Sequence, residues 1–160
     1  MWDLTEGLFL RNNDTGRAMY GSSHADTIIG RGGNDQINGG NGDDIIFGGA
    51  GTDYLTGGAG ADTFGFFATD VGNGVDTIYD FNFTQGDVID MRDVLSGYDP
   101  LTDNIADFVS FVDPNPYASN LYIDIDGTGT GHSAVHVATL NGLNAVNLQQ
   151  MIDDGNLLVA

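Results

Sequence analysis

A nine-residue repeat between residues 21 and 65 constrains the fold more than any other feature of this 160-residue chain. Read in nines, the segment gives five units: GSSHADTII, GRGGNDQIN, GGNGDDIIF, GGAGTDYLT and GGAGADTFG. Glycine dominates places one, two and four, aspartate always takes place six, and a large apolar residue always takes place eight. A fixed period with fixed positions indicates an architecture in which similar units stack on one another.

Within each unit the residue types predict a turn followed by a very short strand. The first six places are rich in glycine, which accepts the positive φ angles that let a backbone curl tightly and its carbonyl oxygens converge. The last three places form the strand, and side chains alternate across a strand, so places six and eight share one face. We therefore expect the apolar residue at place eight to fill a core and the aspartate at place six to point inward.

Inward carboxylates and converging carbonyl oxygens predict bound calcium. Both are hard oxygen ligands, and calcium tolerates irregular geometry better than magnesium does. One unit is expected to cross one side of a roll, so a full coil takes two units and the aspartates stack in two rows. The first row is Asp26, Asp44 and Asp62, and the second is Asp35 and Asp53. Ions shared between consecutive coils, at 26/44, 44/62 and 35/53, give at least three calcium ions.

Other interpretations of the glycine-rich segment fit less well. A flexible linker needs no phase, whereas the aspartate and the apolar residue keep theirs over five units. A phosphate-binding loop requires G-x-x-x-x-G-K-[ST], and the chain contains no lysine. Local pairs such as Gly49 and Gly51 lack the third glycine of a dinucleotide-binding fingerprint.

The net charge of −19 favours a fold that depends on cations. Aspartate carries nearly all of it, and four arginines oppose it. Such an excess repels nucleic-acid phosphates and anionic lipid, so no nucleic-acid partner is expected. It also opposes compaction, so we expect the chain to be largely unfolded without metal and to fold when metal binds.

The sequence contains few features that indicate a cellular compartment. The chain has no cysteine, so calcium would replace disulfides as the cross-link. No apolar run approaches the roughly 18 residues of a transmembrane helix, so no membrane insertion is expected. No charged n-region and apolar h-region open the sequence, which predicts no N-terminal signal peptide.

The flanks of the repeat are expected to close the roll. Residues 1–20 predict a strand or two that cap its open start, because the first coil of a stack has no neighbour. After residue 65 the nine-residue period is interrupted. Degenerate units follow in GNGVDTIY and GDVID, so the roll is expected to span residues 21–89. Asp76, Asp80 and Asp87 are therefore candidates to close the terminal calcium sites.

Residues 90–160 predict a β-rich cap with short helices. Helices are expected over 91–96 after Asp90, near 102–107, and after Asn144 until Gly155. Strands are expected at 108–112, 121–125, 132–140 and 157–159. The fold class is therefore mainly all-β: a right-handed parallel β-roll of calcium-binding nonapeptides with a C-terminal cap.

Partial matches to known motifs in this cap do not predict an active site. Asp124 and Asp126 match only part of an EF-hand loop, so a hairpin turn is favoured. His132 and His136 have the spacing of a metalloprotease motif without its glutamate, and on a strand they would lie about 13 Å apart. No G-x-S-x-G elbow is present either. We therefore expect no enzymatic activity from these residues.

One side of the roll is expected to be covered. Ile29, Ile45 and Phe47 take outward places on adjacent strands, whereas the outward residues of the other side are mostly polar. Exposing such an apolar cluster is unusual. We expect the N-terminal strand or part of residues 90–160 to cover it, the alternative being a surface that binds a partner.

The second half of the chain adds a resemblance. With the nonapeptides, the runs DTIYDFNFTQGDVIDMRDVLSG, YIDIDGTGTG and LQQMIDDGNLLVA resemble the C-terminal type I secretion target domain of large bacterial RTX adhesins, over residues 21–160. The nonapeptides are highly specific, but serralysin-type proteases and alginate epimerase modules share the D-x-I-x-D-F run between Asp76 and Asp90. Ser22 and His24 depart from the pattern in the first unit.

The resemblance implies a secreted, non-enzymatic export and folding module. A type I exporter would be a transient partner that reads the C-terminal end, and millimolar calcium outside the cell would fold the chain. An adhesin would hold the module at the cell surface through upstream regions. Two alternatives stay open: the C-terminal RTX module of a secreted protease, lipase or polysaccharide epimerase, and an adhesin head that binds a host-surface or glycan ligand.

Overall fold

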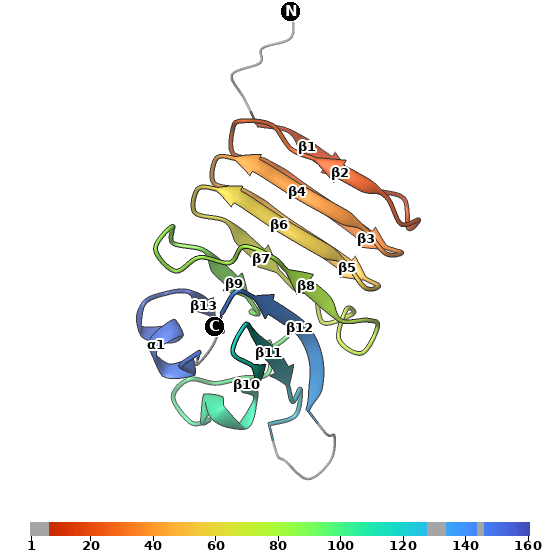
Figure 1. Cartoon of the computed structure of the whole chain (residues 1–160). Helices are drawn as coiled ribbons and strands as arrows, with labels where there is room; N and C mark the ends of the chain where they lie inside the picture. The colour runs from red at the N-terminus through yellow and green to blue at the C-terminus, as the bar shows by residue number, and fades with distance from the viewer. Residues whose placement is uncertain (1–6, 128–133, 144–145) are drawn as a thin grey trace, which may run out of the picture.

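The computed structural model describes residues 7–127, 134–143 and 146–160, which form a stack of strands in two sheets (Figure 1). Sheet A has six strands in the order β1 (Phe9–Arg11), β3 (Thr27–Gly32), β5 (Ile45–Ala50), β7 (Thr63–Gly65), β9 (Val88–Asp90) and β13 (Leu157–Leu158). Sheet B has seven in the order β2 (Ala18–Tyr20), β4 (Gln36–Asn41), β6 (Tyr54–Ala59), β8 (Asp76–Ile78), β12 (Val135–Asn141), β11 (Ala118–Ile123) and β10 (Val109–Asn115).

The chain alternates between the two sheets and so coils into a parallel roll. Thr27 lies opposite Ile45 in sheet A, and Gln36 lies opposite Tyr54 in sheet B, so each coil takes two nonapeptides. All the pairings among β1 to β9 are parallel. The β-roll predicted from the repeat is therefore confirmed.

The strands are longer than predicted. Each of β3 to β6 has six residues rather than three, because pairing continues through the first three places of the next unit. The second-place glycines take part in the ladder at positive φ, as Gly49 does at 95°. A Cβ on Gly49 would collide with the carbonyl group of Arg31 in the neighbouring coil. Glycine thus allows the coils to approach closely where the strand bends into the turn.

A single file of side chains fills the space between the sheets. The eighth-place residues are at most 1% exposed: Ile28, Ile37, Ile46, Leu55 and Phe64. Ile78 and Ile89 continue the same file in the last coils. The sixth-place aspartates lie beside this file and are buried as well.

The N-terminal strands do more than cap the roll. Phe9 lies opposite Thr27 and Ala18 opposite Gln36, so β1 and β2 form a further coil in the same phase. Leu10 and Met19 take the core place of that coil and pack against the buried core. The amide of Leu8 donates to Asp26, and the amide of Arg17 donates to Asp35 Oδ1 at 2.7 Å. A backbone amide therefore holds the coils together even where the aspartate is missing.

The C-terminal part continues both sheets. β13 pairs with β9 and β12 pairs with β8, both in parallel, and β11 and β10 follow as antiparallel strands. Both sheets thus continue from one of the predicted parts of the chain into the next. The division into residues 1–20, 21–89 and 90–160 therefore stays a prediction.

Several local expectations for the cap need correction. Residues 91–96 form turns instead of the predicted helix, with one bond of helical spacing from the Leu95 amide to the Met91 carbonyl. The turn of 3₁₀ helix at Ile105–Asp107 lies within the expected segment. Helix α1 (Leu148–Asp153) is capped by Asn147, whereas the expected start at Asn144 lies outside the described residues, and Gly155 follows the helix at φ 78°. Within the described residues, no helix is long and apolar enough to span a membrane.

The cover expected over the apolar face of sheet A is only partial, although Asp90, Arg92 and Asp93 line a shallow pocket together with Phe47. Strands β1 and β2 extend the stack at its edge, and residues 90–160 extend it at the other end. Ile45 is 41% exposed. Phe47 is half-buried because the ring of Phe67, from the insertion after β7, stacks on it with centroids 4.5 Å apart.

Candidate metal centre

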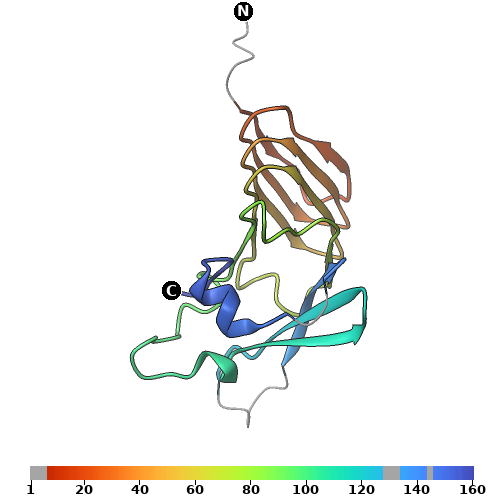
Figure 2. The same cartoon turned by 60° about the vertical axis from the view of Figure 1, so that its left-hand side comes forward.

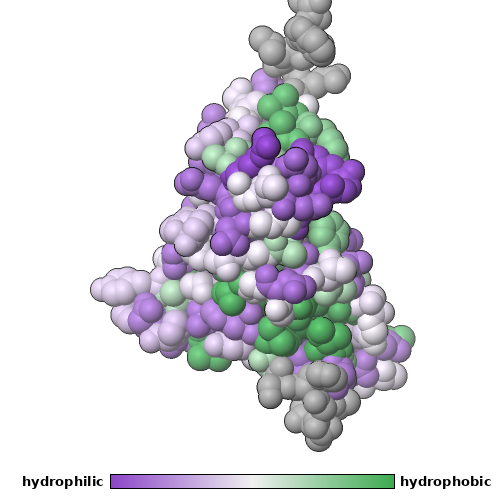
Figure 3. Space-filling view, turned by 90° about the vertical axis from the view of Figure 1, so that its right-hand side faces the viewer, coloured by the Kyte–Doolittle hydropathy of each residue, from purple (hydrophilic) through white to green (hydrophobic). Residues whose placement is uncertain are grey.

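The structure stacks the sixth-place aspartates in two rows, as the repeat predicts. Each amide donates to Oδ1 of the next aspartate in its row, over 2.7 to 3.0 Å. The first row runs Asp26, Asp44, Asp62 and Asp87, and the second runs Asp35, Asp53 and Asp76. The turns of the second row lie on the edge that faces the viewer in Figure 3, where hydrophilic residues dominate the upper half.

Four carboxylates in these rows keep one oxygen unused. Within the part of the chain that the structure describes, the buried Oδ2 atoms of Asp35, Asp44, Asp53 and Asp62 have no hydrogen-bond partner. A buried polar atom without a partner is costly, and a buried charge is costlier unless an opposite charge lies nearby. These four oxygens are therefore arranged to suit a cation.

The surroundings of the unused oxygens suit calcium in particular. A Cβ on Gly39 would collide with Asp44 Oδ2 and lie 2.7 Å from the Gly57 carbonyl oxygen. A Cβ on Gly30 would lie 2.6 Å from Asp35 Oδ2 and collide with the carbonyl oxygen of Gly48. Gly30 and Gly39 therefore each leave a cradle lined by a carboxylate oxygen and a carbonyl oxygen, the hard donors that calcium prefers. Gly48 and Gly57 likewise leave space beside Oδ2 of Asp53 and Asp62.

Side chains alone do not complete any such site. Among the described residues, no three His, Cys, Asp or Glu side chains gather around one point. Backbone carbonyl oxygens of the glycine-rich turns must therefore supply much of the donor set. This division fits calcium, which accepts six to eight oxygen ligands of mixed origin.

Burial makes the metal-free rows electrostatically unfavourable. Desolvation raises the pKa of Asp53 and of Asp62 to about 6 and that of Asp76 to about 8, and neighbouring carboxylates push in the same direction. Desolvation also raises the pKa of Asp35 and Asp44. A cation between the coils would offset these costs.

The ends of the first row differ from its middle. Asp26 Oδ2 accepts from the Ser22 amide, and its Oδ1 accepts from the Ser22 hydroxyl. Asp87 Oδ1 accepts from the Asp62 amide, and its Oδ2 accepts from the Asn82 amide at 2.8 Å. Both carboxylates are thus satisfied by the chain itself, which makes them weaker candidates for metal ligands than Asp44 and Asp62.

Asp80 lies outside both rows. Its two oxygens accept from the amides of Gly57 and Gly58 at 2.9 and 2.8 Å. This carboxylate therefore holds the glycines of β6 in place. Asp76, by contrast, takes its place in the second row and accepts the Asp53 amide at 2.9 Å.

Other residues hold the turns together without having been predicted. Asn12 Nδ2 donates to Asp35 Oδ1 at 2.9 Å from the N-terminal coil. At place five, Asp43 Oδ1 accepts the Ala61 amide at 2.9 Å, and Asn34 Oδ1 accepts the Thr52 amide at 3.0 Å. These contacts could have been predicted from the sequence. Asn12 is the first residue of a degenerate nonapeptide, and place five repeatedly carries a side chain that can accept a hydrogen bond.

The residues of the weaker motif matches in the cap do not gather into a metal-binding cluster among the described residues. Asp124 Oδ1 accepts the Asp126 amide at 3.3 Å, which is the local geometry of a turn. His136 Nε2 lies 3.0 Å from the Ala138 carbonyl oxygen, and its ring stacks on Tyr122. His132 lies outside the described residues.

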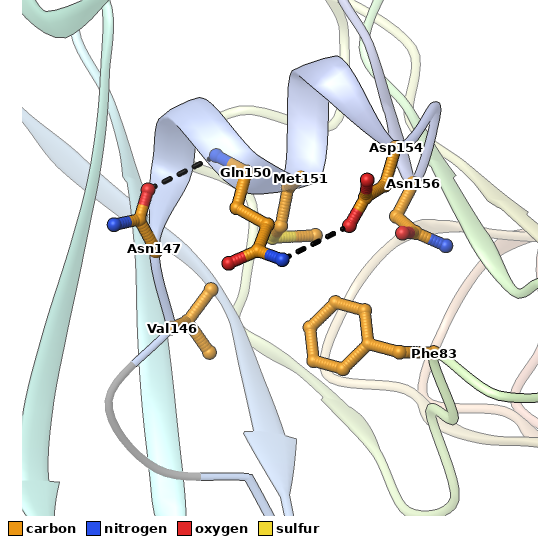
Figure 4. A pocket seen from close by; sticks show the side chains of 7 residues that line it. All are labelled: Phe83, Val146, Asn147, Gln150, Met151, Asp154 and Asn156. Atoms are coloured by element: carbon orange, nitrogen blue, oxygen red, sulfur yellow. Dashed lines mark hydrogen bonds between the residues drawn. The ribbon is translucent and has the colours of Figure 1, made fainter.

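A pocket of about 260 Å³ lies between α1 and the loop before β9 (Figure 4). Its lining residues are Phe83, Val146, Asn147, Gln150, Met151, Asp154 and Asn156. Asp154 is the single titratable side chain in this lining, and it accepts from the Gln150 amide group at 3.3 Å. The pocket therefore offers no acid–base pair, and the absence of enzymatic activity stays a prediction.

Comparison with known families identifies the repeat. Residues 20–55 and 30–64 match the family described as the RTX calcium-binding nonapeptide repeat (four copies). The chain contains RTX calcium-binding repeats. RTX repeats bind calcium, whereas the assignment of the ions to the aspartate rows and glycine cradles, and the number of ions, stay predictions. No curated protein matches the chain in sequence.

Two solved structures place these RTX repeats in a similar fold. The solution structure of the AlgE6R3 subunit of the Azotobacter vinelandii mannuronan C5-epimerase is 28% identical, with a TM-score of 0.66. The match covers 93% of this chain and 81% of that one. The AlgE6R2 subunit of the same epimerase is 26% identical over 98% of this chain and 92% of that one, with a TM-score of 0.59. The resemblance to an adhesin domain finds no support in these matches.

The unequal roles of the aspartates predict unequal effects on calcium binding. Asp44→Asn neutralises a buried carboxylate with an unused oxygen, whereas Asp26→Asn changes one that Ser22 already satisfies. Isothermal titration calorimetry should show calcium affinity reduced at least about tenfold more by the first change than by the second. The reverse order would contradict the assignment of sites along the first row.

The raised pKa values predict how pH affects the metal-free roll. Asp53, Asp62 and Asp76 bind protons in the fold at a pH where the unfolded chain has released them. Stability from these groups is present at low pH and is lost as the pH rises through about 6 to 8. In chelator, far-ultraviolet circular dichroism should therefore show more β-structure at about pH 5 than at about pH 8. With calcium present the order of stability should reverse, because protons compete for the same oxygens. A β-structure content in chelator that rises with pH would contradict the prediction.

Proposed function

We propose that the chain is a calcium-dependent folding module of an exported protein. The observation that carries this proposal is the set of four buried carboxylate oxygens without partners in a chain of net charge −19. When bound, calcium supplies the positive charge that these oxygens lack and joins neighbouring coils. Asp35, Asp44, Asp53 and Asp62 hold it, together with carbonyl oxygens of the place-one glycines.

The stacked architecture supports a switch between unfolded and folded states. Each coil buries its core residues only against its neighbours, so the coils stabilise one another cooperatively. Because a preformed site is absent from the unfolded chain, the free energy of binding calcium is part of the free energy of folding. Extracellular calcium modules work with sites of about 10⁻⁴ to 10⁻³ M. Such a module stays unfolded where calcium is scarce and folds outside the cell.

The C-terminal end is the proposed signal for a type I exporter. In the folded chain this end is tied to the last coil, because Asn156 Nδ2 donates to the Asp87 carbonyl at 2.7 Å and Leu157 is buried. An exporter would therefore read the end before the roll forms. Calcium-driven folding outside the cell would then bury the signal and oppose backward movement.

A second candidate places the module in a secreted polysaccharide-modifying enzyme instead of an adhesin. The similarity to two subunits of a mannuronan C5-epimerase, over more than nine-tenths of this chain, favours it. In that setting the roll would fold or position a catalytic domain elsewhere in the protein. Upstream sequence separates the candidates: tandem β-sandwich repeats belong to an adhesin, and a catalytic motif belongs to an enzyme.

Calcium should be required for folding. In chelator, far-ultraviolet circular dichroism should show a largely disordered chain at neutral pH, and millimolar calcium should produce β-structure with a cooperative melt. Magnesium should rescue poorly, because it demands tighter octahedral geometry. Equal melting curves in chelator and in calcium would overturn the proposal.

Export should depend on the C-terminal residues and not on the ability to fold. With a matching type I exporter, deletion of residues 144–160 should abolish secretion. The matched control is Asp53→Ala with Asp62→Ala, which removes two carboxylates whose Oδ2 atoms have no partner among the described residues but leaves the C-terminal residues intact. The control should be secreted and fail to fold in calcium. Undiminished export of the truncated chain would end the secretion proposal and leave the calcium proposal standing.

A further inference from the structure

The outer face of sheet B is uncharged along four neighbouring strands. The outward positions of β2, β4, β6 and β8, together with the residue directly after β8, are Ala18, Tyr20, Gln36, Asn38, Tyr54, Thr56, Thr77 and Tyr79. None of these side chains is charged, although the chain carries 23 acidic residues. The strands lie side by side in the order β2, β4, β6 and β8 from the top of the roll downward (Figure 1). A face that excludes charge in such an acidic chain is suited to a ligand without charge.

Three tyrosines stand out from this face. Tyr20, Tyr54 and Tyr79 are 64%, 45% and 49% exposed. The rings of Tyr54 and Tyr79 lie 6.0 Å apart and form a pair, while Tyr20 lies on β2, three strands from β8. Neighbouring strands are about 4.8 Å apart, so Tyr20 is separated by roughly 10 Å from Tyr54 and by roughly 14 Å from Tyr79 across the sheet. The face thus presents an aromatic surface at each end.

Polar side chains with unused hydrogen-bonding groups lie between the tyrosines. The register places Gln36 beside Tyr54, and Asn38 between Tyr20 and Thr56. Within the described part of the chain, the side chains of Gln36, Asn38, Thr56 and Thr77 make no hydrogen bond. Their amides and hydroxyls can both donate and accept hydrogen bonds, and solvent or a ligand must satisfy them.

The backbone of this face restricts how a ligand can bind. The strands β4, β6 and β8 are paired on both sides, so an extended peptide cannot join them as an additional strand. Recognition must therefore come from ring faces, hydroxyls and amides. A second copy of the chain is disfavoured, because two molecules of charge −19 repel each other. The same repulsion disfavours an acidic polymer.

We propose that this face binds a neutral, flat polysaccharide chain, of the β-linked type that extends as a ribbon. The C–H faces of its sugar rings would stack on the tyrosines, and its hydroxyls would bond the amides and hydroxyls between them. Tyrosine combines an apolar ring with a polar tip, which suits a ligand that is apolar on its faces and polar at its rim. This site goes beyond the proposed folding role, and it requires calcium because the roll sets the spacing of the tyrosines.

The test is a titration of the calcium-loaded chain with cellohexaose, followed by ¹⁵N–¹H chemical shifts. Shifts should concentrate in β2, β4, β6 and β8. Tyr54→Ala and Tyr79→Ala should each weaken binding at least about tenfold, whereas Tyr79→Phe, which keeps the ring, should stay within about threefold. The matched control is Tyr117→Ala, because Tyr117 is 75% exposed in the turn between β10 and β11. That change should leave the affinity unaltered.

Calcium-dependent melts of every variant separate this site from the folding role. A variant that melts like the unchanged chain but no longer binds cellohexaose supports the site. No saturable binding to the folded chain, or binding that the Tyr54 and Tyr79 changes leave intact, overturns it without touching the calcium proposal. Equal affinity for an oligomannuronate of the same length also overturns it, because an acidic ligand should be repelled. Failure to fold in calcium would instead overturn the proposed function.

Discussion

The hydrogen bond from each sixth-place amide to the next aspartate in its row is the contact on which the rest of the roll depends. It uses one carboxylate oxygen to fix the register of neighbouring coils, and it buries the other oxygen beside the glycine turn. The first role stabilises the stack, and the second makes the stack unfavourable without a cation. The stacking contact and the proposed calcium dependence thus come from two atoms of the same side chain.

The glycines make this arrangement sterically possible. At place one the missing Cβ opens the space beside Oδ2, as Gly39 does beside Asp44. At place two the backbone has positive φ, which glycine adopts freely. Arg31 takes the same conformation at φ 78° despite its side chain, and its guanidinium lies 3.9 Å from Asp14 in the preceding coil. The unit therefore tolerates a departure at place two more readily than one at place one, where a side chain would fill the cradle.

The sequence predicted the parts of the fold that a strict period determines. Asp44 and Ile46 recur at fixed intervals, so coil length, core file and aspartate rows followed from counting. The N-terminal coil was predicted only as a cap, because Leu8 and Arg17 stand where aspartate would be and only their backbone amides keep the contact. Asp80 could not be assigned, because its role depends on which amides the fold brings within reach. Turns such as residues 91–96 do not recur at a fixed interval, so the repeat does not predict them. Their conformation depends on tertiary packing.

The interior and exterior of the roll are encoded at different places of the same unit. Places six and eight are fixed by stacking, since a change at either would affect the row or the core file. Places seven and nine face outward and are free to differ between the two sheets. Sheet A carries Ile45 and Phe47 there and covers part of them with Phe67, whereas sheet B carries Tyr54, which is exposed, and Thr56, which is half-buried. A repeat whose inner places serve folding can therefore acquire binding functions at its outer places without altering how it folds.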